Sequence, residues 1–156
     1  MKTISEAKDF LNENYKDGCI CPCCNQTVKL YKRKLNSGMA KALIIMLKLH
    51  KNNPNKNGFK MNMEIAKLKI PSSNIEYSKL KYWGLVQELK DEDATAGAKT
   101  SGVWKLTQKG KDFTLGKITV PTHVNIYNKI KYGYSEEHTN IVKALGNHFD
   151  YNELMN

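Results

Sequence analysis

Four cysteines lie within six residues, Cys19-Ile20-Cys21-Pro22-Cys23-Cys24, and no other part of the chain is as well suited to metal or thiol chemistry. Cys21 and Cys24 have the C-P-x-C spacing of a tight turn on which two thiolates can bind one zinc ion. Tetrahedral zinc takes four ligands, and Cys19 could supply a third. The spacing therefore predicts a zinc knuckle with Cys19, Cys21 and Cys24 as ligands and zinc as the cofactor.

Two other interpretations of the cysteine cluster stay open. Strong zinc sites have a second cysteine pair a dozen or more residues away, and this chain has none, so the turn could be a knuckle without its metal or a group of reactive thiols. A fourth zinc ligand would have to be a histidine, and spacing selects none of the four: His50, His123, His138 and His148.

The positive charge of the chain is concentrated in one window. The 156 residues carry 25 Lys and Arg against 15 Asp and Glu, which gives a net charge of +10. Residues 29 to 81 hold thirteen of these cations and only two acidic residues, so this window alone carries +11. A concentrated basic surface favours a polyanion, because neutralised phosphates release their counterions. The alternative is a solvated face that keeps the protein soluble.

The type of cation limits what such a surface can recognise. Arg33 is the only arginine, and the other 24 cations are lysines. Lysine meets phosphate as a point charge, whereas arginine forms the planar fork that recognises guanine with two hydrogen bonds. We therefore expect contacts to a nucleic-acid backbone to dominate.

The first half of the chain has the periodicity of a mainly helical region. An amphipathic helix is expected over residues 4–14, capped by Thr3 or Ser5, and a basic strand over residues 27–35. Further helices are expected from about Gly38 to Leu49, with Ser37 as N-cap, and over 61–68. The capping box Ser73-Asn74-Ile75-Glu76 predicts a third helix that runs to about Trp83.

The second half of the chain is predicted to contain more strand. A hairpin is expected from a strand over 85–89 and a second over 103–106, with a long loop between them, followed by a short helix capped by Thr107. The tail has the pattern of short strands at 118–121, 124–127 and 130–132, with a tight turn at Asn128-Lys129. A helix over 136–145 and a final turn over 150–155 complete it.

Residues 37–116 resemble the winged helix–turn–helix class of DNA-binding domains. The resemblance rests on Leu80-Lys81-Tyr82-Trp83-Gly84-Leu85-Val86, where the third helix ends, and on Trp104-Lys105-Leu106-Thr107-Gln108-Lys109-Gly110-Lys111-Asp112-Phe113. The second segment is similar to the Leu-Thr-x-x-Gly ending of winged-helix repressors. The whole chain also resembles small bacteriophage and mobile-element proteins with a C-P-x-C knuckle, a resemblance that implies no activity.

These patterns together predict an α+β fold in three parts. Residues 1–36 would form an N-terminal helix, the Cys-rich knuckle and the basic strand. Residues 37–117 would form a winged helix–turn–helix core, and residues 118–156 a C-terminal β-hairpin plus helix.

The winged-helix resemblance implies that the third helix enters the major groove of DNA and that the wing follows a phosphate backbone. At 100° per residue, Leu80 and Trp83 fall on one side of that helix and Ser78 and Lys81 on the other. The DNA-binding residues expected from the resemblance and from the basic strand are Asn74, Tyr77, Ser78, Lys79, Lys81, Lys32, Arg33, Lys34, Lys99 and Lys105. Lys109 and Lys111 are further phosphate candidates, whereas the acidic run Asp91-Glu92-Asp93 at the base of the wing would repel a backbone.

No pattern of an enzyme is present in the sequence. It has no Walker loop, no G-x-S-x-G elbow and no H-E-x-x-H pair, so we expect no enzymatic activity. The N-terminus lacks the apolar segment of a secretory signal, and the longest apolar run, Ala42 to Leu47, is far shorter than the roughly 20 residues of a membrane span. A cytoplasmic protein is expected.

The favoured function is therefore double-stranded DNA binding by a phage or mobile-element regulator of transcription, with the tail as a candidate homodimer interface. The alternative is a phage-encoded inhibitor whose basic face covers an acidic host protein, such as a member of a nucleic-acid-binding or defence complex.

Overall fold

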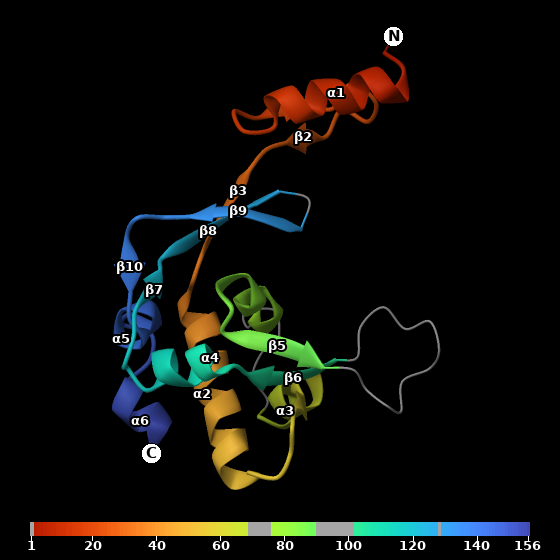
Figure 1. Ribbon diagram of the computed structural model, residues 1–156. Helices are drawn as coiled ribbons and strands as arrows, with labels where there is room; N and C mark the ends of the chain where they lie inside the picture. The colour runs from red at the N-terminus through yellow and green to blue at the C-terminus, as the bar shows by residue number, and fades with distance from the viewer. Residues whose placement is uncertain (1, 69–75, 90–101, 128) are drawn as a thin grey trace. The chain divides into compact units, whose positions relative to one another are not determined.

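Strands from both ends of the sequence pair in the computed structural model, in which residues 2–68, 76–89, 102–127 and 129–156 are described (Figure 1). The chain groups into two compact units: unit 1 contains residues 1–34 and 123–135, and unit 2 contains residues 35–122 and 136–156. The fold is a mixed α+β arrangement of helices and several small antiparallel sheets. The division into segments 1–36, 37–117 and 118–156 stays a prediction.

The described residues of unit 1 form one helix, one short hairpin and one three-stranded sheet. Its elements are α1 (Ile4–Asn14), β1 (Cys19–Ile20), β2 (Thr27–Val28), β3 (Tyr31–Lys34), β8 (His123–Tyr127) and β9 (Ile130–Tyr134). β1 pairs with β2, and the sheet order is β3-β8-β9. The expected basic strand is therefore two strands, with β3 at the edge of the sheet.

Tyrosines hold unit 1 together. The ring of Tyr15, at the end of α1, stacks on the ring of Tyr127 with centroids 4.4 Å apart, and the Tyr132 ring lies 5.5 Å away at a tilt. Of the two expected caps, Thr3 and Ser5, Thr3 caps α1, since its side chain accepts a hydrogen bond from the Glu6 amide while the Glu6 carboxylate accepts from the Thr3 amide. The helix itself buries only Ala7.

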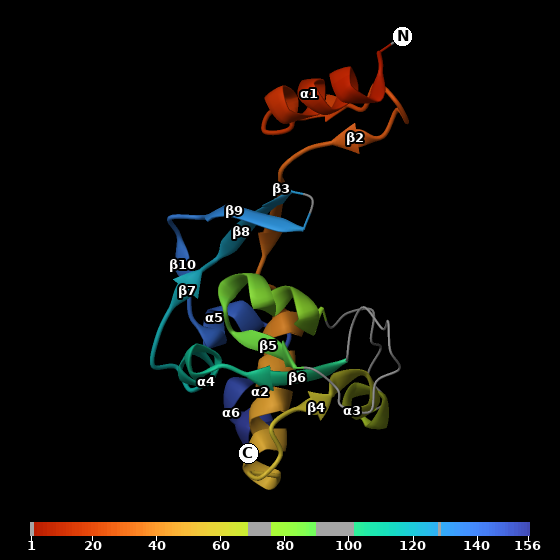
Figure 2. The ribbon, with the colours of Figure 1, turned by 45° about the vertical axis from the view of Figure 1, so that its right-hand side comes forward.

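Unit 2 is built around α2 (Ser37–Asn52), which the sequence predicted as a central buried helix (Figure 2). Its buried side chains are Met39, Ala40, Ala42, Leu43, Ile44, Met46 and Leu47. Helices η2 (Tyr77–Trp83), α4 (Gln108–Thr114), α5 (Ile141–Leu145) and α6 (Tyr151–Met155) pack against it. Burial of this apolar helix supplies much of the core of unit 2.

The strands described in unit 2 form two small sheets. β4 (Phe59–Lys60), β6 (Val103–Leu106) and β5 (Val86–Leu89) make an antiparallel sheet in the order β4-β6-β5. β7 (Val120–Pro121) pairs with β10 (His138–Thr139). Helix α3 (Met61–Lys67) follows β4 directly.

Several expected boundaries in unit 2 were wrong. The N-cap of α2 is Asn36 rather than Ser37, because the Asn36 carboxamide oxygen accepts the Met39 amide at 2.9 Å. The third helix is described over Tyr77–Trp83 and is a 3₁₀ helix without a side-chain cap. The expected helix over 136–145 covers only Ile141–Leu145, because His138 and Thr139 pair with β7.

Other expectations are confirmed or lie outside the described residues. Thr107 caps α4, with its side chain accepting the Gly110 amide. The capping-box residues Ser73 to Ile75 and the tip of the expected wing lie outside the described residues, as does Asn128 of the expected turn. Among the helices that are described, none has the length and apolar character needed to cross a bilayer.

Candidate nucleic-acid interface

Helix η2 presents two different sides. A 3₁₀ helix repeats every three residues, so Tyr77, Leu80 and Trp83 share a face. Leu80 and Trp83 are completely or almost completely buried, and the Trp83 indole donates to the Pro121 carbonyl at 2.7 Å. Lys81 is exposed and Ser78 is half-buried. The predicted inward side of Leu80 and Trp83 and the outward position of Lys81 are confirmed, and Tyr82 is buried as well.

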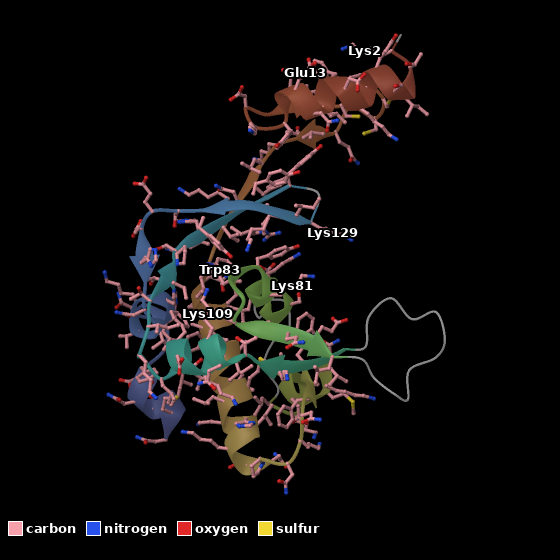
Figure 3. The ribbon with its side chains drawn as sticks, viewed as in Figure 1. Lys2, Glu13, Lys81, Trp83, Lys109 and Lys129 are labelled. Carbon is pink, nitrogen blue, oxygen red and sulfur yellow. The ribbon has the colours of Figure 1, made fainter. Side chains whose placement is uncertain are left out.

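The end of η2 is held by the segment that follows β6. Gly84 adopts a left-handed conformation with φ of 73°, which ends the helix. The Thr107 hydroxyl donates to the Gly84 carbonyl at 2.6 Å and accepts the Gly110 amide at 3.0 Å. The Lys109 ammonium donates to the Trp83 carbonyl at 3.0 Å (Figure 3). The Leu-Thr-x-x-Gly pattern therefore has a structural purpose: it fixes the last turn of η2.

Tyr77 joins three elements of unit 2. Its hydroxyl donates to the Asn62 carboxamide oxygen on α3, and its ring meets the Trp104 ring of β6 edge-on at 5.8 Å. Burial, with a smaller contribution from the charge of Glu88, raises the pKa of Tyr77. The sequence suggested Tyr77 as a DNA-binding residue, and these contacts give it a positioning role that couples α3 to η2.

The remaining lysines of this part of unit 2 differ in exposure. Lys79 is half-buried, and the Lys81 ammonium lies 5.4 Å from the centroid of the Tyr82 ring. Lys67 forms an ion pair with Glu64 at 3.3 Å on the surface of α3. Lys105 is half-buried on β6, where it pairs across the sheet with Gln87 of β5.

The basic window of residues 29 to 81 is divided between the two units. The described part from β4 to Gly84 carries four lysines, Lys60, Lys67, Lys79 and Lys81, against Glu64 and Glu76. Lys32, Arg33 and Lys34 are exposed on edge strand β3 of unit 1, with Arg33 on the opposite face from the two lysines. Asn74 and Lys99 lie outside the described residues.

The cysteine cluster forms a hairpin turn in unit 1. Cys19 pairs with Val28, the Cys21 amide donates to the Gln26 carbonyl at 2.8 Å, and Asn25 turns the chain with φ of 60°. Hydrogen bonds from the backbone amides of Cys24 and Cys23, together with the Cys24 thiol, hold the pKa of the Cys21 thiol below its usual range. Cys21 is 7% exposed, Cys19 is half-buried and Cys24 is exposed.

This geometry brings together two of the three expected metal ligands. All four cysteines and all four histidines belong to the described residues, and within that part of the chain no group of three or more His, Cys, Asp or Glu side chains could hold a metal ion. Cys21 and Cys24 are neighbours, but Cys19 does not join them in such a group.

A hollow on unit 2 was not anticipated from the sequence. It has a volume of about 620 Å³ and lies between α2, α3 and α6. Most of its exposed lining is apolar, and the charged lining residues are three lysines and one glutamate, which pairs with Lys67. The lining residues are Lys41, Ile44, Ile45, Lys48, Leu49, Asn52, Glu64, Lys67, Leu68 and Leu154. The sequence signal that could have revealed it is the stripe of Lys41, Ile44, Ile45 and Lys48 at helical spacing.

No protein-family model, curated protein or solved structure matches the chain.

Proposed function

We propose that the protein binds double-stranded DNA through α3 and η2 of unit 2, as a winged helix–turn–helix domain. The observation that carries the proposal is the element order of unit 2: helices α2, α3 and η2 are followed by the antiparallel pair β5 and β6. Three helices and then a hairpin is the order that the winged-helix resemblance implies. The small strand β4, between α2 and α3, pairs with β6 and ties the helices to that hairpin.

The way η2 is fixed suits it to contact a groove. Its inner side is anchored by Leu80 and Trp83, and its end by Thr107 and Lys109, so Lys81 projects from a supported backbone. At roughly 2.0 Å per residue its seven residues span about 14 Å, which is comparable with the major-groove width of about 12 Å. Such support lowers the entropy lost when a side chain meets DNA.

The side chains available favour backbone contacts with little selectivity for sequence. Lys79 and Lys81 can meet phosphates, and Ser78 is the described candidate for a base edge, since a hydroxyl can donate to or accept from several bases. A phage or mobile-element regulator of transcription is the simplest role for such a protein.

The proposal is tested by fluorescence anisotropy with labelled nucleic acids of one length. At low ionic strength, duplex DNA of random sequence should bind with a Kd on the order of micromolar, the range of non-specific DNA binding. Single-stranded DNA and duplex RNA should bind more weakly, because neither offers a wide major groove. Tighter binding to RNA or to single strands would contradict the groove assignment.

A second candidate function is supported by the hollow between α2, α3 and α6. Its apolar lining, with Lys41 and Lys48 in excess of the Lys67–Glu64 pair, is complementary to an amphipathic helix with an acidic face, supplied by a partner protein. An inhibitor that covers an acidic host protein would use this surface rather than η2.

The hollow can be tested with a helical peptide that has leucines on one face and glutamates on the other. Leu68→Ser, at a lining residue 50% exposed, should weaken peptide binding, and Met63→Ser, at an α3 residue 58% exposed and outside the hollow, should not. A peptide with lysines in place of the glutamates should bind at least about tenfold more weakly. Equal binding of the two peptides would exclude charge complementarity as the basis of docking.

A further inference from the structure

The three-stranded sheet of unit 1 is rich in positive charge and in tyrosine. Strands β3, β8 and β9, which lie side by side in Figure 1, contain cations and tyrosines but no acidic residue. Cations next to aromatic rings are typical of surfaces that bind nucleic acid, because phosphates meet the cations and bases stack on the rings. The cations are Lys32, Arg33, Lys34 and Lys131, and the tyrosines are Tyr31, Tyr127, Tyr132 and Tyr134.

One face of this sheet carries both a pair of lysines and an aromatic cluster. Lys32 pairs with Asn125 of β8, and Lys34 lies two residues further along β3, so both lysines share the face of Asn125. Tyr127 lies two residues beyond Asn125 in β8 and belongs to that face as well. Both lysines are exposed, and they are about 7 Å apart along the edge strand.

The aromatic cluster on this face leaves one ring accessible. The rings of Tyr15 and Tyr127 stack with their centroids 4.4 Å apart. The centroid of the Tyr132 ring lies 5.5 Å from that of Tyr15 and 6.1 Å from that of Tyr127. Although its ring meets both neighbours at a tilt, Tyr132 is 46% exposed, so part of an aromatic surface that is already held in place faces the solvent.

A β-bulge keeps the surface beside that ring open. The register of β8 with β9 skips Tyr132, which is the extra residue of the bulge. Gly133 follows it and pairs with Asn125, so that Lys32, Asn125 and Gly133 form one row about 10 Å long across the sheet. Apart from the chain neighbours of Gly133, no atom of the described residues lies within 4 Å of the place where its Cβ would be. The surface between the tyrosine ring and the lysines is therefore free of large side chains at Gly133.

We propose that this face of unit 1 binds single-stranded nucleic acid, with a base stacked on the Tyr132 ring and backbone phosphates on Lys32 and Lys34. A single strand fits this face because its bases are unpaired and can lie flat on a ring, whereas the bases of a duplex are stacked inside it. Lysines and tyrosine rings recognise phosphates and base faces rather than the sugar, so DNA and RNA strands are equivalent ligands. The site belongs to unit 1 and does not depend on duplex binding by unit 2.

The test is the fluorescence anisotropy of a labelled oligo(dT) with the full chain at low ionic strength. Its binding should be weaker than the duplex binding proposed for unit 2, with a Kd on the order of 10 to 100 µM. An abasic strand of the same length keeps the phosphates but has no base to stack, and it should bind at least about fivefold more weakly. An oligo(U) of that length should bind as tightly as oligo(dT).

Two substitutions at Tyr132 separate stacking from packing. Tyr132→Leu keeps an apolar side chain but removes the ring, so it should weaken oligo(dT) binding at least about fivefold. Tyr132→Phe keeps the ring and should bind as the wild type does. The comparison with the abasic strand uses the wild-type protein, so a misfolded Leu variant would not obscure the result.

Removal of the lysine pair tests the phosphate contacts. Alanine at both Lys32 and Lys34 should lower the slope of log K against log salt concentration for oligo(dT) by about 1.4, because each phosphate of a single strand contributes about 0.7. Alanine at both Lys79 and Lys81 removes the same charge from unit 2 and should leave oligo(dT) binding unchanged. Duplex binding should show the opposite pattern, so this site and the duplex site can fail independently.

Four results would overturn the proposal. Absence of oligo(dT) binding at low ionic strength would mean that this face binds no single strand. Equal binding of the abasic strand would mean that no base stacks on Tyr132. Equal losses in the two double lysine variants would mean that net charge, rather than this face, governs binding. A strong preference for either DNA or RNA would mean that the sugar is recognised, which these side chains do not explain.

Discussion

Replacing Gly110 by alanine should lower the free energy of unfolding by about 3 kcal/mol, a large value for a single methyl group. A Cβ at Gly110 would lie 2.0 Å from the carbonyl oxygen of Leu85. That atom belongs to the backbone, so the clash can be relieved only by moving α4 away from the start of β5. Since alanine is the better helix former by about 1 kcal/mol, a loss of stability here cannot come from helix propensity.

Chemical denaturation followed by tryptophan fluorescence measures the free energy of unfolding of unit 2, which contains Gly110. Both tryptophans, Trp83 and Trp104, belong to unit 2, so their emission reports the unit that contains Gly110. Gln108→Ala, on the exposed side of the same helix, is the control and should cost less than about 1 kcal/mol. If Gly110→Ala were as stable as the wild type, the close approach of α4 to Leu85 would not be a constraint on the fold.

Replacing Lys79 and Lys81 by alanine should weaken duplex binding about a hundredfold or more at low salt. Each lysine contributes a charge-assisted contact to a phosphate in the proposed complex, and such contacts are worth about 1.5 kcal/mol or more. The loss of two phosphate contacts should also reduce the slope of log K against log salt concentration by about 2.

The control removes the same charge elsewhere. Lys8 and Lys16 are exposed residues of unit 1, in α1 and directly after Tyr15, so the Lys8→Ala and Lys16→Ala double variant has the same net charge as the η2 variant. It should bind duplex nearly as well as the wild type. Equal losses in both variants would show that net charge, rather than η2, governs binding.

The sequence was most informative where a local signal decides the structure. Thr3 with Glu6, and Thr107 with the Gly110 amide, are caps whose partners lie three residues away, so the pattern located Thr107 and narrowed the cap of α1 to Thr3 or Ser5. The buried length of α2 followed from its nearly continuous apolar composition. Adjacent caps are harder to separate, since Asn36 and Ser37 are equally good N-caps and only the path of the backbone chooses Asn36.

Elements that depend on distant pairing were missed. β4 has only two residues, and it is a strand because Phe59 and Lys60 pair with Trp104 and Val103 of β6. The region before α5 was expected to be helical, but His138 and Thr139 pair with β7 instead. Non-local pairing of this kind overrides local propensity and leaves no periodicity in so short a segment.

In the candidate sites, too, the sequence predicted the local features but not those that depend on distant contacts. Spacing identified the Cys21–Cys24 turn, but whether Cys19 joins them depends on where β1 ends and the turn begins, which spacing does not encode. Composition identified the basic window, but not that β3 and η2 belong to different units. The role of Tyr77 depends on Asn62 and Trp104, fifteen and twenty-seven residues away in the chain.

Affinity for duplex DNA across a series of salt concentrations tests the central claim most directly. If α3 and η2 bind the phosphate backbone, log K should fall linearly with log salt concentration, with a slope of about −0.9 for each phosphate neutralised. Absence of binding at low ionic strength, or an affinity that does not change with salt, would contradict DNA binding and leave the hollow between α2, α3 and α6 as the surface to pursue.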